Sequence, residues 1–168
     1  PELPVLNQPE IQPQDYRDAM AKFAGAVHVI STDGPAGRRG VTVIAACSVS
    51  DEPPTILVCL NRIKTENDAF AENGVFALNT LAEGHIEVSN AFSGLTGLSQ
   101  DERFALSQWD TIASGAPTLA GALSVLDCRI VETKDMATHR IHFGRVIGVR
   151  INPDQRPLIY HDRGYKLL

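Results

Sequence analysis

The feature that most constrains this chain is the segment 40–54, which reads GVTVIAACSVSDEPP. Its β-branched residues predict a strand over 41–49, and the double proline at Pro53 and Pro54 ends it, because proline lacks the amide that sheet pairing needs. Strands usually carry bulky side chains in their middle, but here four small residues stand in a row from Ala45 to Ser48. Small side chains let a flat ligand approach the backbone closely and leave amides and hydroxyls free to bond it. The segment therefore predicts a ligand-binding strand.

The bulk composition narrows the class of protein. A chain of 168 residues fits one domain with a sizeable core, and 43% hydrophobic and 21% charged residues are ordinary for a globular protein. The net charge of −5 and the lack of a basic run argue against a nucleic-acid partner. No apolar stretch approaches the roughly 20 residues of a membrane helix, and the N-terminus has no signal-peptide pattern. We therefore expect no membrane partner.

The cysteine and histidine positions predict no metal site. Cys47, Cys59 and Cys128 are widely spaced and form no Cys-x-x-Cys pair, so neither a zinc site nor a disulfide framework is expected, and a reducing cytoplasm is the simplest location. His139 and His142 are three residues apart within a predicted strand. Side chains alternate between the two faces of a strand, so these imidazoles point to opposite sides and cannot share one ion.

The order of elements predicts a mainly β fold with a few helices. Residues 1–14 contain three prolines and are interpreted as an extended arm, and residues 15–168 as one domain. A capping box, Ser99-x-x-Glu102, precedes one helix. We expect helices from Pro13 to Gly25, over 65–71 with Asn73-Gly74 as its stop, and over 83–92. We expect strands over 26–31, 41–49, 55–60, 75–81, 124–133, 140–152 and 158–160. Many short strands with few helices favour a closed or nearly closed antiparallel sheet.

Common nucleotide and nucleophile motifs are missing from the chain. The glycines at Gly34, Gly37 and Gly40 do not form Gly-x-Gly-x-x-Gly, and no phosphate loop or Gly-x-Ser-x-Gly elbow occurs. Any nicotinamide chemistry must therefore use a fold other than the doubly wound sheet.

From about Tyr16 to the C-terminus, the chain resembles the flavin reductase family. The resemblance rests on the order and spacing of several segments rather than on one motif. These are 42–48, Asn79-Thr80-Leu81, Phe92-Ser93-Gly94, Arg103-Phe104, 115–119, 138–146, Pro157-Leu158-Ile159-Tyr160 and Gly164-Tyr165. One departure is that Ala137-Thr138 stand where the family usually has Gly-Asp before its histidine.

The resemblance implies a split-barrel (Greek-key) FMN-binding fold and a homodimer with flavin sites near the subunit interface. It implies hydride transfer from NADH or NADPH to bound FMN, or FAD, to supply reduced flavin to a partner monooxygenase. Two alternatives stay open. One is a reductase that keeps its flavin and reduces a metal centre, the cobalt of a corrin or a ferric chelate. The other is a flavin-binding module without turnover.

The resemblance also implies the site residues. His139 is the expected catalytic residue and would contact the nicotinamide or the flavin ring. If 140–149 is a strand, His139, Ile141 and Phe143 share one face, and His142 points the other way. Trp109 is interpreted as a packing residue. The expected cofactor-binding residues are Thr42, Ile44, Ala45, Ala46, Cys47, Ser48, Leu60, Asn61, Lys64, Thr65, Phe92, Ser93, Gly94, His139 and Tyr165.

Overall fold

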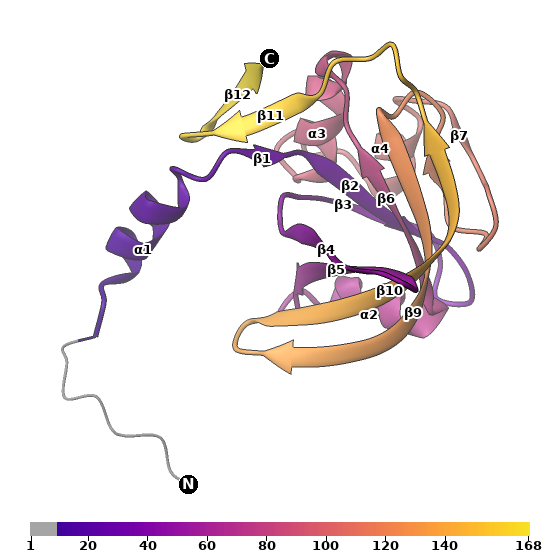
Figure 1. The fold of residues 1–168 in the computed structure, drawn as a ribbon, viewed down its shortest axis with the longest axis horizontal. Helices are drawn as coiled ribbons and strands as arrows, with labels where there is room; N and C mark the ends of the chain where they lie inside the picture. Colours follow the sequence, from indigo (N-terminus) through magenta and orange to yellow (C-terminus); the bar gives the residue numbers. More distant parts are fainter. Residues whose placement is uncertain (1–9) are drawn as a thin grey trace, which may run out of the picture.

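The computed structural model describes residues 10–168, and residues 1–9 of the predicted arm lie outside the described part. Strands dominate, so the mainly β prediction is confirmed (Figure 1). The helices are α1 (Pro13–Met20), α2 (Asp68–Asn73), α3 (Ile86–Phe92) and α4 (Gln100–Phe104), with short 3₁₀ helices η1 (Thr65–Asn67) and η2 (Glu83–His85). Between residues 10 and 168, no helix is long and apolar enough to cross a membrane. The strands are β1 (Gly25–Ala26), β2 (His28–Thr32), β3 (Arg39–Val43), β4 (Ala46–Asp51), β5 (Pro54–Asn61), β6 (Val75–Thr80), β7 (Trp109–Asp110), β8 (Thr118–Leu119), β9 (Ser124–Met136), β10 (His139–Ile151), β11 (Leu158–His161) and β12 (Gly164–Leu167).

Seven strands form one antiparallel sheet in the order β3-β2-β6-β9-β10-β5-β4. Its two edge strands, β3 and β4, follow each other in the chain with only Ile44 and Ala45 between them. Two edges joined by two residues cannot lie far apart, so the sheet must curl until its edges approach (Figure 1).

The prediction of one continuous strand over 41–49 is wrong, because the chain bends within this range and forms two strands. The chain bends at Ile44 and Ala45, where the Ala46 amide donates to the Ile44 carbonyl over 2.8 Å. The part before the bend pairs with β2, and the part after it pairs with β5. Neither glycine nor proline stands at the bend, so no local residue type marked it. The bend follows from closing the sheet.

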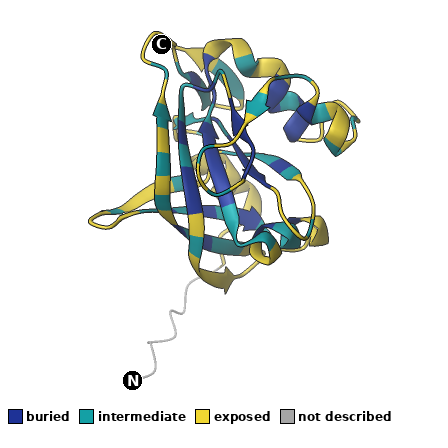
Figure 2. Cartoon of the chain, turned by 90° about the vertical axis from the view of Figure 1, so that its right-hand side faces the viewer, coloured by how far each residue is buried: buried dark blue, intermediate teal, exposed yellow. Residues whose placement is uncertain are grey.

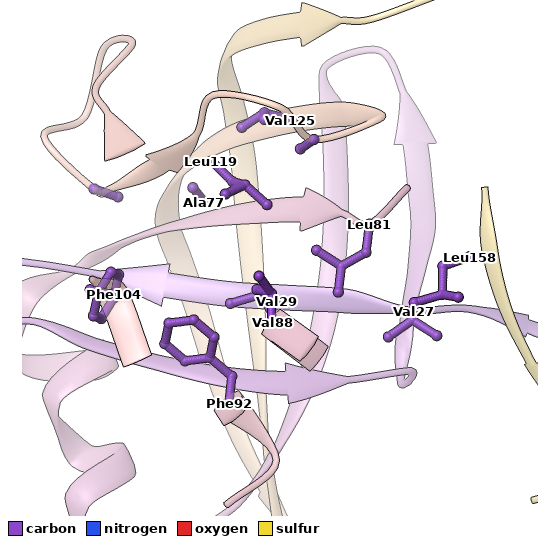
Figure 3. Close-up of a cluster of buried hydrophobic side chains, with 12 residues drawn as sticks. Val27, Val29, Ala77, Leu81, Val88, Phe92, Phe104, Leu119, Val125 and Leu158 are labelled. Carbon is purple, nitrogen blue, oxygen red and sulfur yellow. The ribbon is translucent and has the colours of Figure 1, made fainter. Parts of the chain in front are cut away.

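Two apolar clusters lie on opposite faces of the sheet. One joins residues from strands at both ends of the sheet, such as Ile30 and Val58, and includes Phe70 of α2. The other contains Val29, Phe92 and Phe104 and is covered by α3, α4 and β11 (Figure 3). Figure 2 shows the buried residues concentrated on the central strands. Burial on both faces rigidifies the sheet that carries the bend.

Helix ends agree with the sequence in two places and differ elsewhere. The helix predicted from Pro13 to Gly25 ends at Met20, because the Lys22 and Phe23 amides donate to carbonyls only three residues back and so turn the chain out of the helix. Ser99 Oγ accepts from the Glu102 amide over 3.2 Å, and the Glu102 carboxylate accepts from the Ser99 amide, which confirms the capping box. Gly74 ends α2 with a φ of 73°, as the Asn73-Gly74 signal predicts. The helix predicted over 65–71 is divided, because Thr65 begins the 3₁₀ helix η1 and α2 starts only at Asp68.

The helix α1 stands out from the sheet (Figure 1) and is attached to the turn between β11 and β12. Arg163 lies 2.6 Å from the Asp18 carboxylate, and Lys22 lies 3.1 Å from the Asp162 carboxylate. The Asp162 amide also donates to the Ala21 carbonyl over 2.8 Å. None of the α1 residues is buried, so polar contacts rather than a packed face position this helix.

Candidate functional site

Three adjoining cavities surround the end of β3, and Thr42 lines all of them. The largest of these three, about 580 Å³, is mostly apolar and reaches Tyr165 and Asn90. The second, about 510 Å³, is polar and reaches Lys64. The third, about 280 Å³, lies against β5 and β10. Together they form one groove along the bend, which we call the β3 groove.

The backbone of β3 offers hydrogen-bonding groups to this groove. The Gln100 side chain accepts from the Gly40 amide over 3.1 Å and donates to its carbonyl over 3.3 Å, so both Gly40 groups face away from β2. The amide and carbonyl groups of successive residues in a strand point to alternate sides, so those of residues two apart point to the same side. The Thr42 amide and carbonyl therefore face away from β2, as those of Gly40 do. The Thr42 hydroxyl is occupied, because it donates to the Ser89 carbonyl over 2.7 Å. The groove therefore presents an open strand edge beside small side chains, which suits a flat heteroaromatic ring.

The close packing behind this strand explains the glycine at position 40. A Cβ on Gly40 would lie 2.6 Å from the Phe92 ring and 3.3 Å from the Phe104 ring. Phe92 and Phe104 contact each other edge-to-face with ring centroids 5.0 Å apart, and Trp109 packs on Phe104 at 4.8 Å. Trp109 is thus the packing residue that we expected. The aromatic cluster holds β3 from behind.

His139 lies at the start of β10, opposite Asn61 of β5, and lines the smallest cavity with Lys64. Its Nδ1 is 2.9 Å from the Thr138 hydroxyl, and the residue is exposed. His142 is 1% exposed and lies 2.9 Å from the Thr133 hydroxyl through its Nδ1. Burial, with the positive charge of Arg140, lowers the pKa of His142 to about 4. The two histidines therefore differ sharply in environment, with only His139 on the groove.

The turn before His139 adopts its shape without the glycine typical of the family. Ala137 has a φ of 51°, a conformation that costs an L-residue free energy. Arg62 stabilises the turn, because its Nε donates to the Ala137 carbonyl over 2.7 Å and its amide to the Thr138 carbonyl over 3.0 Å. Arg62 is therefore occupied by the hairpin, and Lys64 remains as the cation of this loop on the groove.

Tyr165 of β12 closes the apolar end of the groove. Its hydroxyl lies 2.7 Å from the Ser89 hydroxyl and donates to the Asn90 side chain over 2.8 Å. The Tyr160 ring packs edge-to-face against it at 5.6 Å. These contacts hold Tyr165 by its hydroxyl, so its ring forms a fixed wall.

The structure brings most of the predicted site residues together. Those that line the β3 groove are Thr42, Ile44, Ala45, Leu60, Asn61, Lys64, Phe92, Ser93, Gly94, His139 and Tyr165. Ala46 lines an adjoining cavity between α1 and the sheet. Cys47, Ser48 and Thr65 are exposed and line none of these cavities.

Sequence reasoning missed three arginines on the groove, namely Arg39 and Arg103 in its polar cavity and Arg163 in its apolar cavity. Arg39 immediately precedes the small-residue segment 40–54, and this position next to the predicted ligand-binding strand was the available signal. Arg103 lies in α4, far along the chain, and only the fold brings it close. Within residues 10–168, no three histidine, cysteine or acidic side chains cluster as a metal site would require.

Comparisons with known proteins give one consistent result. A family model described as a flavin reductase like domain matches residues 20–168. The FMN reductase (NADH) RutF of Ancylobacter novellus is 48% identical over 157 residues, which cover 94% of this chain and 86% of that protein. The solved flavin reductase PheA2 is 26% identical with a TM-score of 0.85, covering 94% and 99% of the two chains. BorF, the flavin reductase component of a bacterial two-component tryptophan halogenase, has the same identity and TM-score and covers 94% and 98%.

Proposed function

The chain belongs to the flavin reductase like family, and from this we propose that it is an NADH-dependent flavin reductase acting on FMN. The observation that carries the proposal is the β3 groove, in which an open strand edge, small side chains and a polar cavity adjoin. A flavin needs the same three features: room for a flat ring, backbone partners for the ring edge and a polar site for the ribityl phosphate.

The residues of the groove fit the flavin. Ala45 allows the ring to approach the backbone, and the Thr42 amide and carbonyl face its edge. Asn61 and Lys64 lie on the polar side of the same groove. When bound, the flavin supplies the acceptor for a hydride from NADH and one proton from solvent, giving NAD⁺ and reduced flavin. The chain supplies position and electrostatics rather than a nucleophile.

His139 is the residue that we assign to the nicotinamide side of the site. It is exposed at the mouth of the smallest cavity, 2.9 Å from the Thr138 hydroxyl that orients its Nδ1. In this place it holds the dinucleotide against the ring or balances the charge of the reduced flavin. Exposure is an advantage here, because the dinucleotide must enter and leave in each turnover.

We propose that the reduced flavin serves a partner oxygenase. The support is that BorF, a solved neighbour, is the reductase component of a two-component enzyme. NADH oxidation should be measured with free FMN, ferric citrate and a cob(II)alamin-type corrin as acceptors. The proposal predicts rapid turnover with FMN. A chain that binds flavin and oxidises NADH only with a corrin or ferric acceptor would favour the metal-reductase alternative, and flavin binding without NADH oxidation would favour a binding module.

We also propose that the protein is a homodimer with the split-barrel fold, located in the cytoplasm. The curled sheet supports the split barrel, and three cysteines without disulfides suit a reducing compartment. The dimer is supported by α1, where Tyr16, Met20 and the following Phe23 are 63%, 40% and 68% exposed at helical spacing. A second copy would cover this apolar stripe. Light scattering should report a dimer, and Phe23→Glu should weaken it without unfolding the monomer.

A further inference from the structure

Packing does not hold the hairpin turn that precedes His139. Residues 131–139, at the end of β9 and the start of β10, are all exposed. The turn consists of two residues, Ala137 and Thr138, which join the paired residues Met136 and His139. An exposed segment with few buried contacts opens easily unless hydrogen bonds hold it. The position of His139 therefore depends on the hydrogen bonds that reach this turn.

One residue from a distant part of the chain, Arg62, holds both members of the turn. Its Nε donates to the Ala137 carbonyl over 2.7 Å, and its amide donates to the Thr138 carbonyl over 3.0 Å. The Thr138 hydroxyl lies 2.9 Å from the His139 Nδ1. Thr138 therefore contacts Arg62 through its backbone and the imidazole through its side chain, which links Arg62 to His139.

The loop that carries Arg62 is itself fixed at its base. The Asn61 side-chain oxygen accepts from the Ile63 amide over 2.9 Å, and the Asn61 carbonyl accepts from the buried Asn67 side chain over 2.8 Å. Asn61 also pairs with His139 and lines the smallest cavity of the groove with it. Arg62 lines none of the three cavities. It therefore ties a fixed loop to the turn without contacting the groove.

Ion pairs hold the strands beside the turn but do not reach the turn itself. Arg140 donates to the Asp135 carboxylate at 2.7 and 3.2 Å and to Asp68 of α2 at 3.2 Å. Arg62 lies 4.0 Å from the same Asp135 carboxylate, which adds a weak attraction at the surface. Within residues 10–168, Arg62 is the residue whose hydrogen bonds reach the carbonyls of both turn residues. Its side chain is therefore the one whose loss would loosen the turn.

We infer that Arg62 is a positioning residue for flavin reduction, because it holds the turn that places His139 on the groove; this inference rests on the proposed function. A group that assists hydride transfer must sit within a narrow range of positions, and a misplacement of about 1 Å can remove its contribution. Because Arg62 acts only through His139, its loss can slow the hydride step by no more than the loss of His139 does. The effect of Arg62 should therefore disappear when His139 is absent.

The test is a double-mutant cycle of Arg62→Ala and His139→Ala, read as the limiting rate of flavin reduction by NADH at saturating flavin. His139→Ala should slow this step about tenfold, and Arg62→Ala about three- to tenfold. The double variant should stay within about twofold of His139→Ala. Flavin affinity, measured by fluorescence quenching, should change less than about threefold in Arg62→Ala, because the lost charge is exposed and screened. Arg62→Lys keeps the charge and a donor, so it should recover part of the lost rate.

The matched control is Arg145→Ala. Arg145 is exposed on the same strand, opposite Thr55, and lines none of the three cavities. This variant should reduce flavin at the wild-type rate, and thermal unfolding should show that every variant is folded at the assay temperature. Losses that multiply in the double variant would overturn the inference, as would a wild-type rate in either single variant of the cycle. A wild type whose bound flavin is not reduced by NADH would instead refute the proposed function and the inference with it.

Discussion

The contrast between His139 and His142 provides the sharpest test of how this fold builds its site. The two residues are three apart on β10, and the register pairs His139 with Asn61 and His142 with Val58. His139 lies on the β3 groove, whereas His142 is buried and lies beside Thr133. Alanine substitutions should therefore separate chemistry from stability.

His139→Ala removes one positioned polar contact to the substrates. A contact of this kind contributes about 1 to 2 kcal/mol, so flavin reduction by NADH should slow on the order of tenfold. Flavin affinity should stay nearly unchanged, because the backbone edge of β3 and the polar cavity are intact. Thermal stability should also change little, since His139 is exposed.

His142→Ala should show the opposite pattern. The side chain is 1% exposed and has the Thr133 hydroxyl as a partner, so its removal leaves a cavity inside the curled sheet. Large-to-small substitutions of this kind cost about 2 to 4 kcal/mol. For a chain of this size the unfolding temperature should fall by roughly 5 to 15 °C. Below that temperature, the hydride step should proceed at nearly the wild-type rate.

The assay is stopped-flow bleaching of the flavin absorbance at saturating flavin, with thermal unfolding of both variants followed by circular dichroism. If His142→Ala is the slow variant and His139→Ala is the unstable one, the register of β10 is wrong. If neither variant is slow, the nicotinamide is held by backbone and shape alone, and His139 has no part in the reaction.

Three further predictions concern stability. Burial lowers the pKa of both His28 and His142 from 6.5 to about 4, so each neutral imidazole contributes its full share to the free energy of unfolding above pH 6.5. As the pH falls toward 4 this contribution should be lost, by at most about 3 kcal/mol for each histidine. A urea midpoint that does not fall between pH 7 and pH 5 would contradict this. Ala137→Gly should raise stability by up to about 1 kcal/mol, because Ala137 has a φ of 51°; a lower unfolding temperature would show that the turn is not strained. Asp127→Ala should lower the free energy of unfolding by about 3 kcal/mol, since the buried carboxylate accepts from the Ala113 and Ser114 amides at 2.8 and 2.7 Å. Chemical denaturation of this variant and of Asp127→Asn, which keeps an acceptor oxygen, tests the prediction.

Local features of the sequence were enough to predict most of the elements. The Ser99–Glu102 capping box and the Asn73-Gly74 stop act through hydrogen bonds between near neighbours, and both are found in the structure. The prediction that His139 and His142 point to opposite faces of β10 also needed only local geometry, because side chains alternate along a strand with a period of two. The resemblance to a family then indicated most of the residues that line the groove, among them Thr42, Lys64 and Tyr165.

Only the tertiary structure decided where the predicted strand bends and which cations meet. The bend at Ile44 and Ala45 exists because β3 pairs with β2 and β4 pairs with β5, at opposite edges of one curled sheet. Long-range pairing leaves no local mark in the residues at the bend. Arg39 and Arg103 likewise reach one cavity from elements distant in the chain. Local propensities are set by neighbouring residues, whereas a binding site depends on contacts between distant segments, and those contacts form only when the sheet closes.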